Sequence, residues 1–220
     1  MKKIIRSLML LSFFVLAWQT VFADSASASL ELVQLQNRWA DIKYTLPEKE
    51  REKAFAVLVE QAEKASIAHP GDAPYLIWEG IIRSTYAGAK GGLGALGEVK
   101  KAKALFEQAI EIDAAAMSGS AYTSLGSLYY QVPGWPVGFG DDELAEQMLK
   151  KGLSLNPDGI DSNFFYADFL LSQDRYKEAM LSFEKALQAP PRPGRELADK
   201  GRKGEIEEGI LKARKKLAKN

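Results

Sequence analysis

Few residues of this chain are of the types that carry out catalysis or bind metals. The sequence has 220 residues, no cysteine and a single histidine, His69. This composition excludes disulfides, thiolate zinc sites, cysteine nucleophiles and any site that needs two histidines from one chain. A Ser-His-Asp triad is also not indicated, because no serine stands in the motif of a nucleophile elbow. We therefore expect no catalytic residue, no metal site and no cofactor, and we predict that the protein is not an enzyme.

Two short segments resemble ligand-binding motifs but lack the spacing that such motifs need. The glycine-rich stretch from Gly88 to Gly97 contains Lys90, yet it lacks the Gly-Lys-Ser/Thr ending of a phosphate loop, and no strand precedes it. We interpret it as a flexible turn. The carboxylates of Asp141, Asp142 and Glu143 do not alternate along the chain as those of a calcium loop do. They open a predicted helix, and we interpret them as capping residues.

The elements that must position any functional side chain are helices. Apolar residues recur with helical periodicity, whereas alternating strand patterns are nearly absent. Breaks rich in proline, glycine and asparagine separate several of the helical segments. The predicted helices cover residues 30–45, 48–68, 73–87, 98–112, 119–131, 142–154, 161–172, 175–188 and 196–218. The sequence therefore predicts an all-α protein built from antiparallel helix pairs.

One helix pair has the residue spacing of a known repeat. Between residues 160 and 191, Ala167 lies in a first helix, and Ala179, Phe183 and Ala186 follow at separations of 12, 4 and 3 residues. Small residues let the two helices approach closely, and the large residue fills the space between them. This pattern resembles the tetratricopeptide repeat family. The resemblance implies a right-handed superhelical array of antiparallel helix pairs, an α-solenoid.

Two earlier segments resemble the same repeat with insertions. Gly80 precedes Ala102, and Gly126 precedes Ala145, by more residues than the repeat allows. We therefore predict insertions in the turns at residues 87–97 and 131–141. The resemblance covers residues 48–191, and we expect a repeat domain over residues 24–195 followed by a basic capping helix over residues 196–220.

A narrower group resembles the second insertion and the helix after it. Gly138-Phe139-Gly140-Asp141, Ala145-Glu146 and Leu155-Asn156-Pro157 are similar to the T-component proteins of TRAP-type transporters. This weaker resemblance implies an alternative function, as a periplasmic accessory subunit of a solute uptake system.

The first 23 residues have the three parts of a secretory signal. Lys2, Lys3 and Arg6 precede an apolar run from residue 8 to 18, and Val21-Phe22-Ala23 is a small-x-small cleavage pattern. We predict cleavage after Ala23 and a periplasmic or secreted protein with no stable membrane anchor after cleavage. Retention of the segment as an anchor is the open alternative, because the apolar run extends toward residue 23.

Charge is balanced overall and uneven along the chain. Lysines and arginines number 29, as do aspartates and glutamates, which disfavours a nucleic-acid partner. Residues 192–220 carry ten basic against five acidic residues. We interpret this excess as the solvated face of the capping helix, with Leu197, Ile206 and Ile210 on the apolar stripe and Arg202 and its basic neighbours opposite.

The repeat resemblance also implies where a ligand binds, because the first helix of each pair lines a concave groove. The groove positions include Ser84, Ser120 and Asp161, and the binding residues that we predict are Ile81, Thr123, Ser127, Tyr130, Phe164 and Asp168. None of these is basic, which suits an apolar, neutral or basic peptide. Packing of some of them against neighbouring repeats is the alternative.

Trp135 is a further binding candidate. It lies between Gly134 and Pro136 in a predicted turn. We interpret it either as an exposed anchor for a partner or as a ring that folds over the helix ends and shields the core. Together these patterns predict an exported, non-enzymatic interaction module that binds a peptide or protein partner. The partner's identity, the oligomeric state and binding of a small apolar ligand are left open.

Overall fold

The computed structural model describes residues 29–219, and within this range every regular element is a helix. The expected signal segment and its cleavage site after Ala23 lie outside the described residues. A helix over residues 29–45 comes first. It is followed by α2 (Glu48–Ala68), α3 (Ala73–Lys90), α4 (Gly92–Ile112), α5 (Ala116–Gln131), α6 (Asp142–Leu155), α7 (Ile160–Ser172), α8 (Tyr176–Leu187) and α9 (Glu196–Leu217). The predicted all-α class is confirmed.

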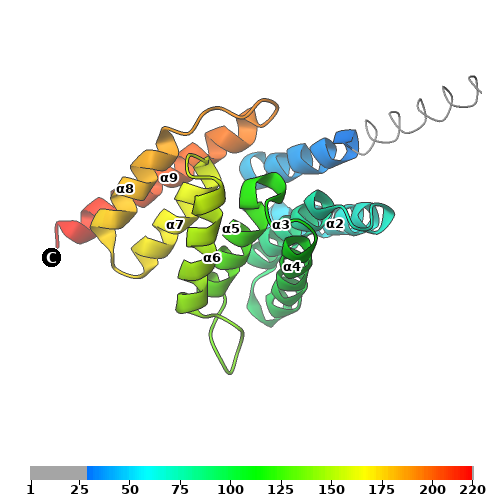
Figure 1. Ribbon diagram of the computed structural model, residues 1–220, viewed down its shortest axis with the longest axis horizontal. Coiled ribbons are helices and arrows are strands. Elements are labelled where there is room, and N and C mark those ends of the chain that lie inside the picture. The colour runs from blue at the N-terminus through cyan, green and yellow to red at the C-terminus, as the bar shows by residue number, and fades with distance from the viewer. Residues whose placement is uncertain (1–28, 220) are drawn as a thin grey trace, which may run out of the picture.

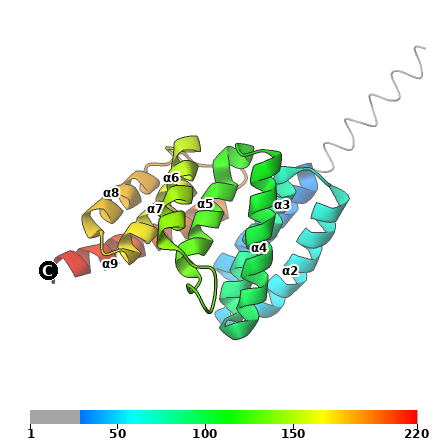
Figure 2. The ribbon, with the colours of Figure 1, turned by 60° about the horizontal axis from the view of Figure 1, so that its bottom comes forward.

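The helices pack as consecutive pairs that stack into a curved array (Figure 1). The helix α3 packs on α4, α5 on α6 and α7 on α8, while α9 covers α8 and the edge of α7. Figure 2 shows the pairs side by side, with α9 at one end and α2 at the other. None of the helices between residues 29 and 219 is long and apolar enough to cross a membrane.

Small residues set the distance between paired helices, as the repeat spacing predicts. A Cβ atom on Gly80 would lie 2.5 Å from the ring of Phe106, and one on Gly126 would lie 2.7 Å from Cγ of Leu149. Both contacts are shorter than the ~3.5–4.0 Å of ordinary carbon contacts. In the pair α7–α8, the corresponding small residue is Ala167, which is fully buried. The three predicted helix pairs are therefore present.

The two predicted insertions have different structures. The prediction of a flexible turn at residues 87–97 is wrong, because α3 continues to Lys90 and α4 begins at Gly92. The extra residues lengthen both helices, and the reversal needs only Gly91 and Gly92, whose φ angles of 65° and 60° suit glycine. The second insertion is the loop expected. It closes with hydrogen bonds from the amides of Gly140 and Asp141 to the carbonyls of Pro133 and Tyr129.

The first described helix contacts the first half of the last helix. Nζ of Lys43, in the helix over residues 29–45, lies 2.9 Å from Oε1 of Glu205 in α9. The ring of Tyr44 packs on Gly201 so closely that no Cβ atom would fit there. Nη1 of Arg195 donates to Oε1 of Gln36 at 3.3 Å. The start of α9 therefore packs beside the first described helix, next to which it lies in Figure 1.

Candidate functional site

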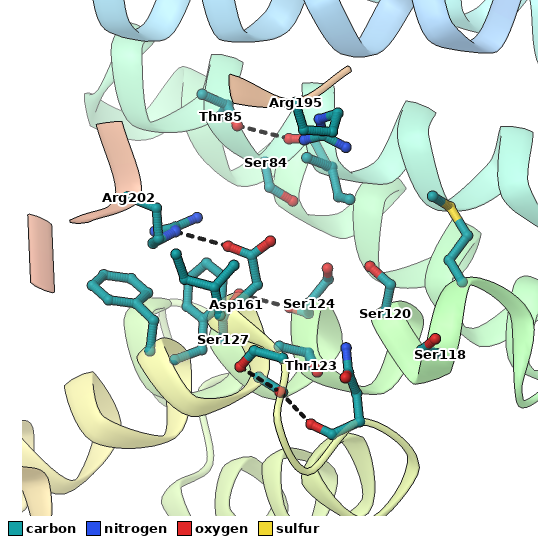
Figure 3. Close-up of a pocket in the computed structure, with 18 of the residues that line it drawn as sticks. Ser84, Thr85, Ser118, Ser120, Thr123, Ser124, Ser127, Asp161, Arg195 and Arg202 are labelled. Carbon is teal, nitrogen blue, oxygen red and sulfur yellow. Dashed lines mark hydrogen bonds and ion pairs between the residues drawn. The ribbon is translucent and has the colours of Figure 1, made fainter. Parts of the chain in front are cut away.

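A pocket of about 730 Å³ lies on the concave side of the array (Figure 3). The first helices of the three pairs, α3, α5 and α7, contribute most of its lining. The connection between α6 and α7, the connection between α8 and α9, the start of α9 and the helix over residues 29–45 contribute further residues. Because α9 packs against the helix over residues 29–45 here, the concave surface is a partly enclosed pocket.

One side of the pocket is lined with hydroxyl groups from α3 and α5. The hydroxyl of Ser84 donates to the carbonyl of Gly80 at 2.7 Å, and that of Ser127 donates to the carbonyl of Ser124 at 2.7 Å. Their oxygens keep the capacity to accept hydrogen bonds. The hydroxyls of Ser120 and Ser124 have no hydrogen-bond partner among the described residues. This surface can therefore both donate to and accept from a ligand.

The same side begins with an unusual turn. Met117, Ser118 and Gly119 have φ angles of 48°, 56° and 75°, and they form a left-handed turn before α5 becomes regular. Met117 and Ser118 line the pocket. Left-handed backbone costs roughly 1–2 kcal/mol per residue other than glycine, so surrounding contacts must hold this turn in place.

A cluster of charged residues in the pocket is built around Asp161. Its Oδ2 accepts from Nη1 of Arg192 at 2.7 Å, and its Oδ1 accepts from Nε of Arg202 at 2.8 Å. Burial raises the pKa of Asp161, but the positive charges of Arg202 and Arg192 outweigh it and hold that pKa well below its usual range. Nη1 of Arg202 also donates to Oε2 of Glu205 at 2.6 Å. The guanidinium of Arg202 is thus held between two carboxylates.

Lys43 completes this charged cluster. Burial and the nearby charge of Arg202 together lower the pKa of Lys43 to about 8, against the opposing effect of Glu205. Its ammonium group also lies 5.2 Å from the centre of the Trp39 ring. Lys43 therefore belongs both to the pocket wall and to the contact between the helix over residues 29–45 and α9.

Five of the predicted binding residues line the pocket, and two do not. The five are Ile81, Thr123, Ser127, Phe164 and Asp168. Thr123 and Phe164 are nearly buried, and the guanidinium of Arg202 covers the ring of Phe164 at 4.2 Å. Phe164 is therefore part of the wall rather than an open aromatic anchor.

The remaining two predicted residues, Tyr130 and Trp135, lie outside the lining. The hydroxyl of Tyr130 donates a hydrogen bond to Oδ2 of Asp168 at 2.7 Å and so fixes the position of that carboxylate. Burial and the charge of Asp168 raise the pKa of Tyr130 well above its usual value. Trp135 is 90% exposed at the tip of the loop between α5 and α6. The alternative that its ring folds over the helix ends is wrong.

The sequence reasoning missed the basic residues of the pocket. As expected, the groove positions of α3, α5 and α7 contain no lysine or arginine, but Lys43, Arg192, Arg195 and Arg202 reach the pocket from the chain ends. Arg202 was expected on a solvated helix face, yet only 5% of it is exposed. The excess of basic residues in the segment 192–220 was the sequence feature that could have indicated basic residues in the pocket. Because α9 packs against the helix over residues 29–45, part of this positive charge faces the pocket.

The acidic start of α6 is a helix cap. Oδ1 of Asp141 accepts from the backbone amides of Glu143 and Leu144 at 3.0 Å each. In the part of the chain that the structure describes, no group of three or more acidic, histidine or cysteine side chains is placed to hold a metal ion.

The comparisons with known proteins find repeats in two segments. A family model described as tetratricopeptide repeat matches residues 93–115 and 160–193. No curated protein matches the sequence.

Solved structures with a similar arrangement are distant. Two crystal structures of MamA are each 19% identical, with TM-scores of 0.43 and 0.42; the matches cover 78% and 84% of this chain and 94% and 93% of theirs. The crystal structure of TTC0263, a thermophilic TPR protein in Thermus thermophilus, is 17% identical with a TM-score of 0.40, over 73% of this chain and 91% of that one.

The segment over residues 160–193 contains α7, α8 and the turn after them, and that over residues 93–115 contains most of α4. Arrays of such repeats present concave surfaces that bind other proteins. In these two segments the chain is thus similar to tetratricopeptide repeats, within an all-helical array.

Proposed function

We propose that this protein is an exported, non-enzymatic interaction module that holds a short segment of a partner protein in the pocket on its concave side. The observation that carries the proposal is the pocket itself, to which all three helix pairs contribute their first helices. Its volume of about 730 Å³ is within the ~300–1,000 Å³ typical of ligand sites.

The lining supports binding of a polar backbone with a few side chains. Hydroxyls of α5, such as those of Ser120 and Ser124, can pair with peptide N–H and C=O groups. Ile81 offers an apolar contact on α3, and Asp168, held by Tyr130, offers a carboxylate on α7. Because helix packing fixes these groups before binding, the ordering cost on binding is low.

Peptide selection with a blocked pocket tests the proposal. Peptides would be selected from a random library on the purified protein, and their affinities measured by isothermal titration calorimetry. We expect dissociation constants near ~1 μM, or about −8 kcal/mol. Ser124→Phe, which places a ring in the pocket from α5, should weaken binding at least about tenfold, or ~1.4 kcal/mol.

Ser154→Phe is the matched control, because Ser154 is exposed on α6 and lies outside the pocket lining. It should bind as the parent does. Equal affinity of Ser124→Phe and the parent, with both folded by circular dichroism, would move the site out of the pocket. The exposed ring of Trp135 would then be the next candidate.

Export is part of the proposal and has its own test. The basic start, the apolar run and the Val21-Phe22-Ala23 pattern support it. Mass spectrometry of the protein from its native host should find a chain that begins at Asp24. An intact Met1 form in the membrane fraction would contradict export by cleavage. No contact of the described residues favours the transporter-accessory alternative, which stays a prediction of the sequence.

A further inference from the structure

We infer that the pocket binds a carboxylate group of its ligand at Arg195. The inference rests on the proposed function, because it assigns a chemistry to the same pocket. It also departs from the sequence reasoning, which favoured a neutral or basic ligand.

The guanidinium of Arg195 is held in place but incompletely paired. It lies over the ring of Trp78, 4.8 Å from the ring centre, and its Nη1 donates to Gln36. Its Nε is buried and has no hydrogen-bond partner in the described part of the chain. Nη2 also has no acceptor there, but it is not a buried atom and can reach solvent. Nε and Nη2 form one side of the guanidinium fork, the geometry that binds both oxygens of a carboxylate.

A second unpaired donor lies on the same wall. Nε1 of Trp78, the ring beneath Arg195, is also buried without a partner among residues 29–219. Trp78 contacts Trp39 edge to face, and Nε1 of Trp39 donates to Thr85 at 2.9 Å. Arg195 and Thr85 appear together at one edge of the pocket in Figure 3. Buried donors without acceptors destabilise a protein, and a bound acceptor removes part of that cost.

The other cations of the pocket already have carboxylate partners. Arg192 pairs with Asp161 and Asp199, at 2.7 Å and 2.6 Å. Arg202 pairs with Asp161 and Glu205, and Lys43 pairs with Glu205. Within the described residues, Arg195 has no carboxylate oxygen within 4 Å of its nitrogens. Among the four cations of this cluster, Arg195 is therefore the one that can form an ion pair with an anionic ligand.

Burial and the nearby charge of Arg192 lower the pKa of Arg195 from its ordinary value of 12.5, against the opposing charges of Asp161 and Asp199. The negative charge of a bound ligand would offset the charge of Arg192. The guanidinium nevertheless stays charged near neutral pH, because arginine is protonated in proteins. The ligand chemistry that fits is thus a carboxylate, and its body is apolar or aromatic because Trp78, Ile81 and Phe165 also line the pocket. Its source is an acidic group of a bound peptide or a free organic acid.

A pair of small probes tests the inference directly. Phenylacetate and phenylacetamide have nearly the same shape and differ in charge. We expect the protein to bind phenylacetate at least about tenfold more tightly, and addition of the acid to shift the Nε–Hε resonance of Arg195 in the NMR spectrum. In Arg195→Gln the preference for the acid should disappear. Arg195→Lys, which keeps the charge and loses the fork, should retain part of it.

Arg38→Gln is the matched control, because Arg38 is an exposed arginine of the helix over residues 29–45 and lies outside the pocket lining. It removes the same charge and should keep the preference for the acid. If Arg195→Gln does not fold, the NMR shift in the unchanged protein still decides the question. Equal binding of the two probes, no binding at millimolar acid, or a preference that survives in Arg195→Gln would overturn the inference.

Experiments with modified peptides distinguish a peptide carboxylate from a free organic acid. They also distinguish failure of the Arg195 inference from failure of the proposed function. Each selected peptide would be compared as a free C-terminal acid, as a C-terminal amide and with its acidic side chains changed to amides. Loss of affinity on either change identifies a peptide carboxylate, whereas indifference to both, together with phenylacetate binding, points to a free organic acid. Peptides that Ser124→Phe excludes but that bind equally as acid and amide would refute the role of Arg195 and leave the pocket proposal standing.

Discussion

Substitution of Gly126 by alanine tests the close packing that defines the helix pairs. Gly126 lies in α5 against Leu149 of α6. An alanine Cβ would lie 2.7 Å from Cγ and 3.0 Å from the backbone nitrogen of Leu149. The side chain of Leu149 could rotate, but its backbone nitrogen can move only with α6. Gly126→Ala should therefore push the two helices apart by about 0.5–1 Å to reach ordinary contact distances of ~3.5–4.0 Å.

Two opposing energies set the size of the effect. Overpacking of a core costs about 1–3 kcal/mol. Replacement of a helical glycine by alanine gains up to about 1 kcal/mol of helix propensity. With the full gain in propensity, the free energy of unfolding should thus fall by up to about 2 kcal/mol, which for a protein of this size lowers the Tm by up to about 8 °C.

Gly204→Ala is the matched control. Gly204 lies in α9, and a Cβ atom there would have no neighbour within 4 Å. This variant should gain the helix propensity without a clash, and its Tm should rise slightly. Differential scanning calorimetry of the two variants beside the parent measures both changes. If Gly126→Ala melts at or above the temperature of Gly204→Ala, then α5 and α6 do not approach as closely as the repeat requires.

Three further predictions concern the turn, the capping helix and pH. Gly92→Ala should lower the Tm, because the φ of 60° at Gly92 disfavours a side chain; Gly97→Ala, where a Cβ atom meets nothing, should not. Deletion of residues 196–220 uncovers the partners of Ile206 and Ile210 and should cause aggregation, visible by light scattering; an unchanged monomer would contradict a capping role. The pKa of Lys43 is about 8 in the folded state and ~10.4 in an unfolded chain. Between pH 8 and pH 10, the unfolded state therefore binds more protons than the folded state. Urea denaturation should therefore show stability that rises from pH 8 toward pH 10, and Lys43→Met should flatten this rise.

The helices and their pairing could be predicted from the sequence because they depend on residues close together in the chain. The spacing from Ala167 through Ala179 to Phe183 and Ala186 describes one helix pair completely, and all four residues are buried. The turn at residues 87–97 could not be predicted in the same way. A stretch with so many glycines has weak helix propensity, and the packing of α3 on α4 overrides that weakness.

The pocket was predictable only in part, for a related reason. Ile81, Ser127 and Asp168 occupy fixed positions in first helices, so the repeat spacing places them on the concave side. Arg195 and Arg202 reach that side only because α9 turns back against the helix over residues 29–45. Nothing in the local pattern of α9 distinguishes Arg202, buried beside Asp161, from its exposed neighbour Lys203.

The contact between the two ends of the array changes how the molecule unfolds. In an open solenoid each repeat touches only its neighbours, so the terminal repeats fray first and unfolding spreads inward. Here Tyr44 and Glu205 are joined across 161 positions of sequence, and Arg195 and Gln36 across 159. Neither end can detach without breaking its contact with the other, so the terminal helices share their stability instead of exchanging their amides independently. We expect these long-range contacts to slow folding, since a chain segment of this length must first be closed into a loop. We also expect the chain to unfold in one cooperative transition, and a separate early transition of either terminal helix would contradict this.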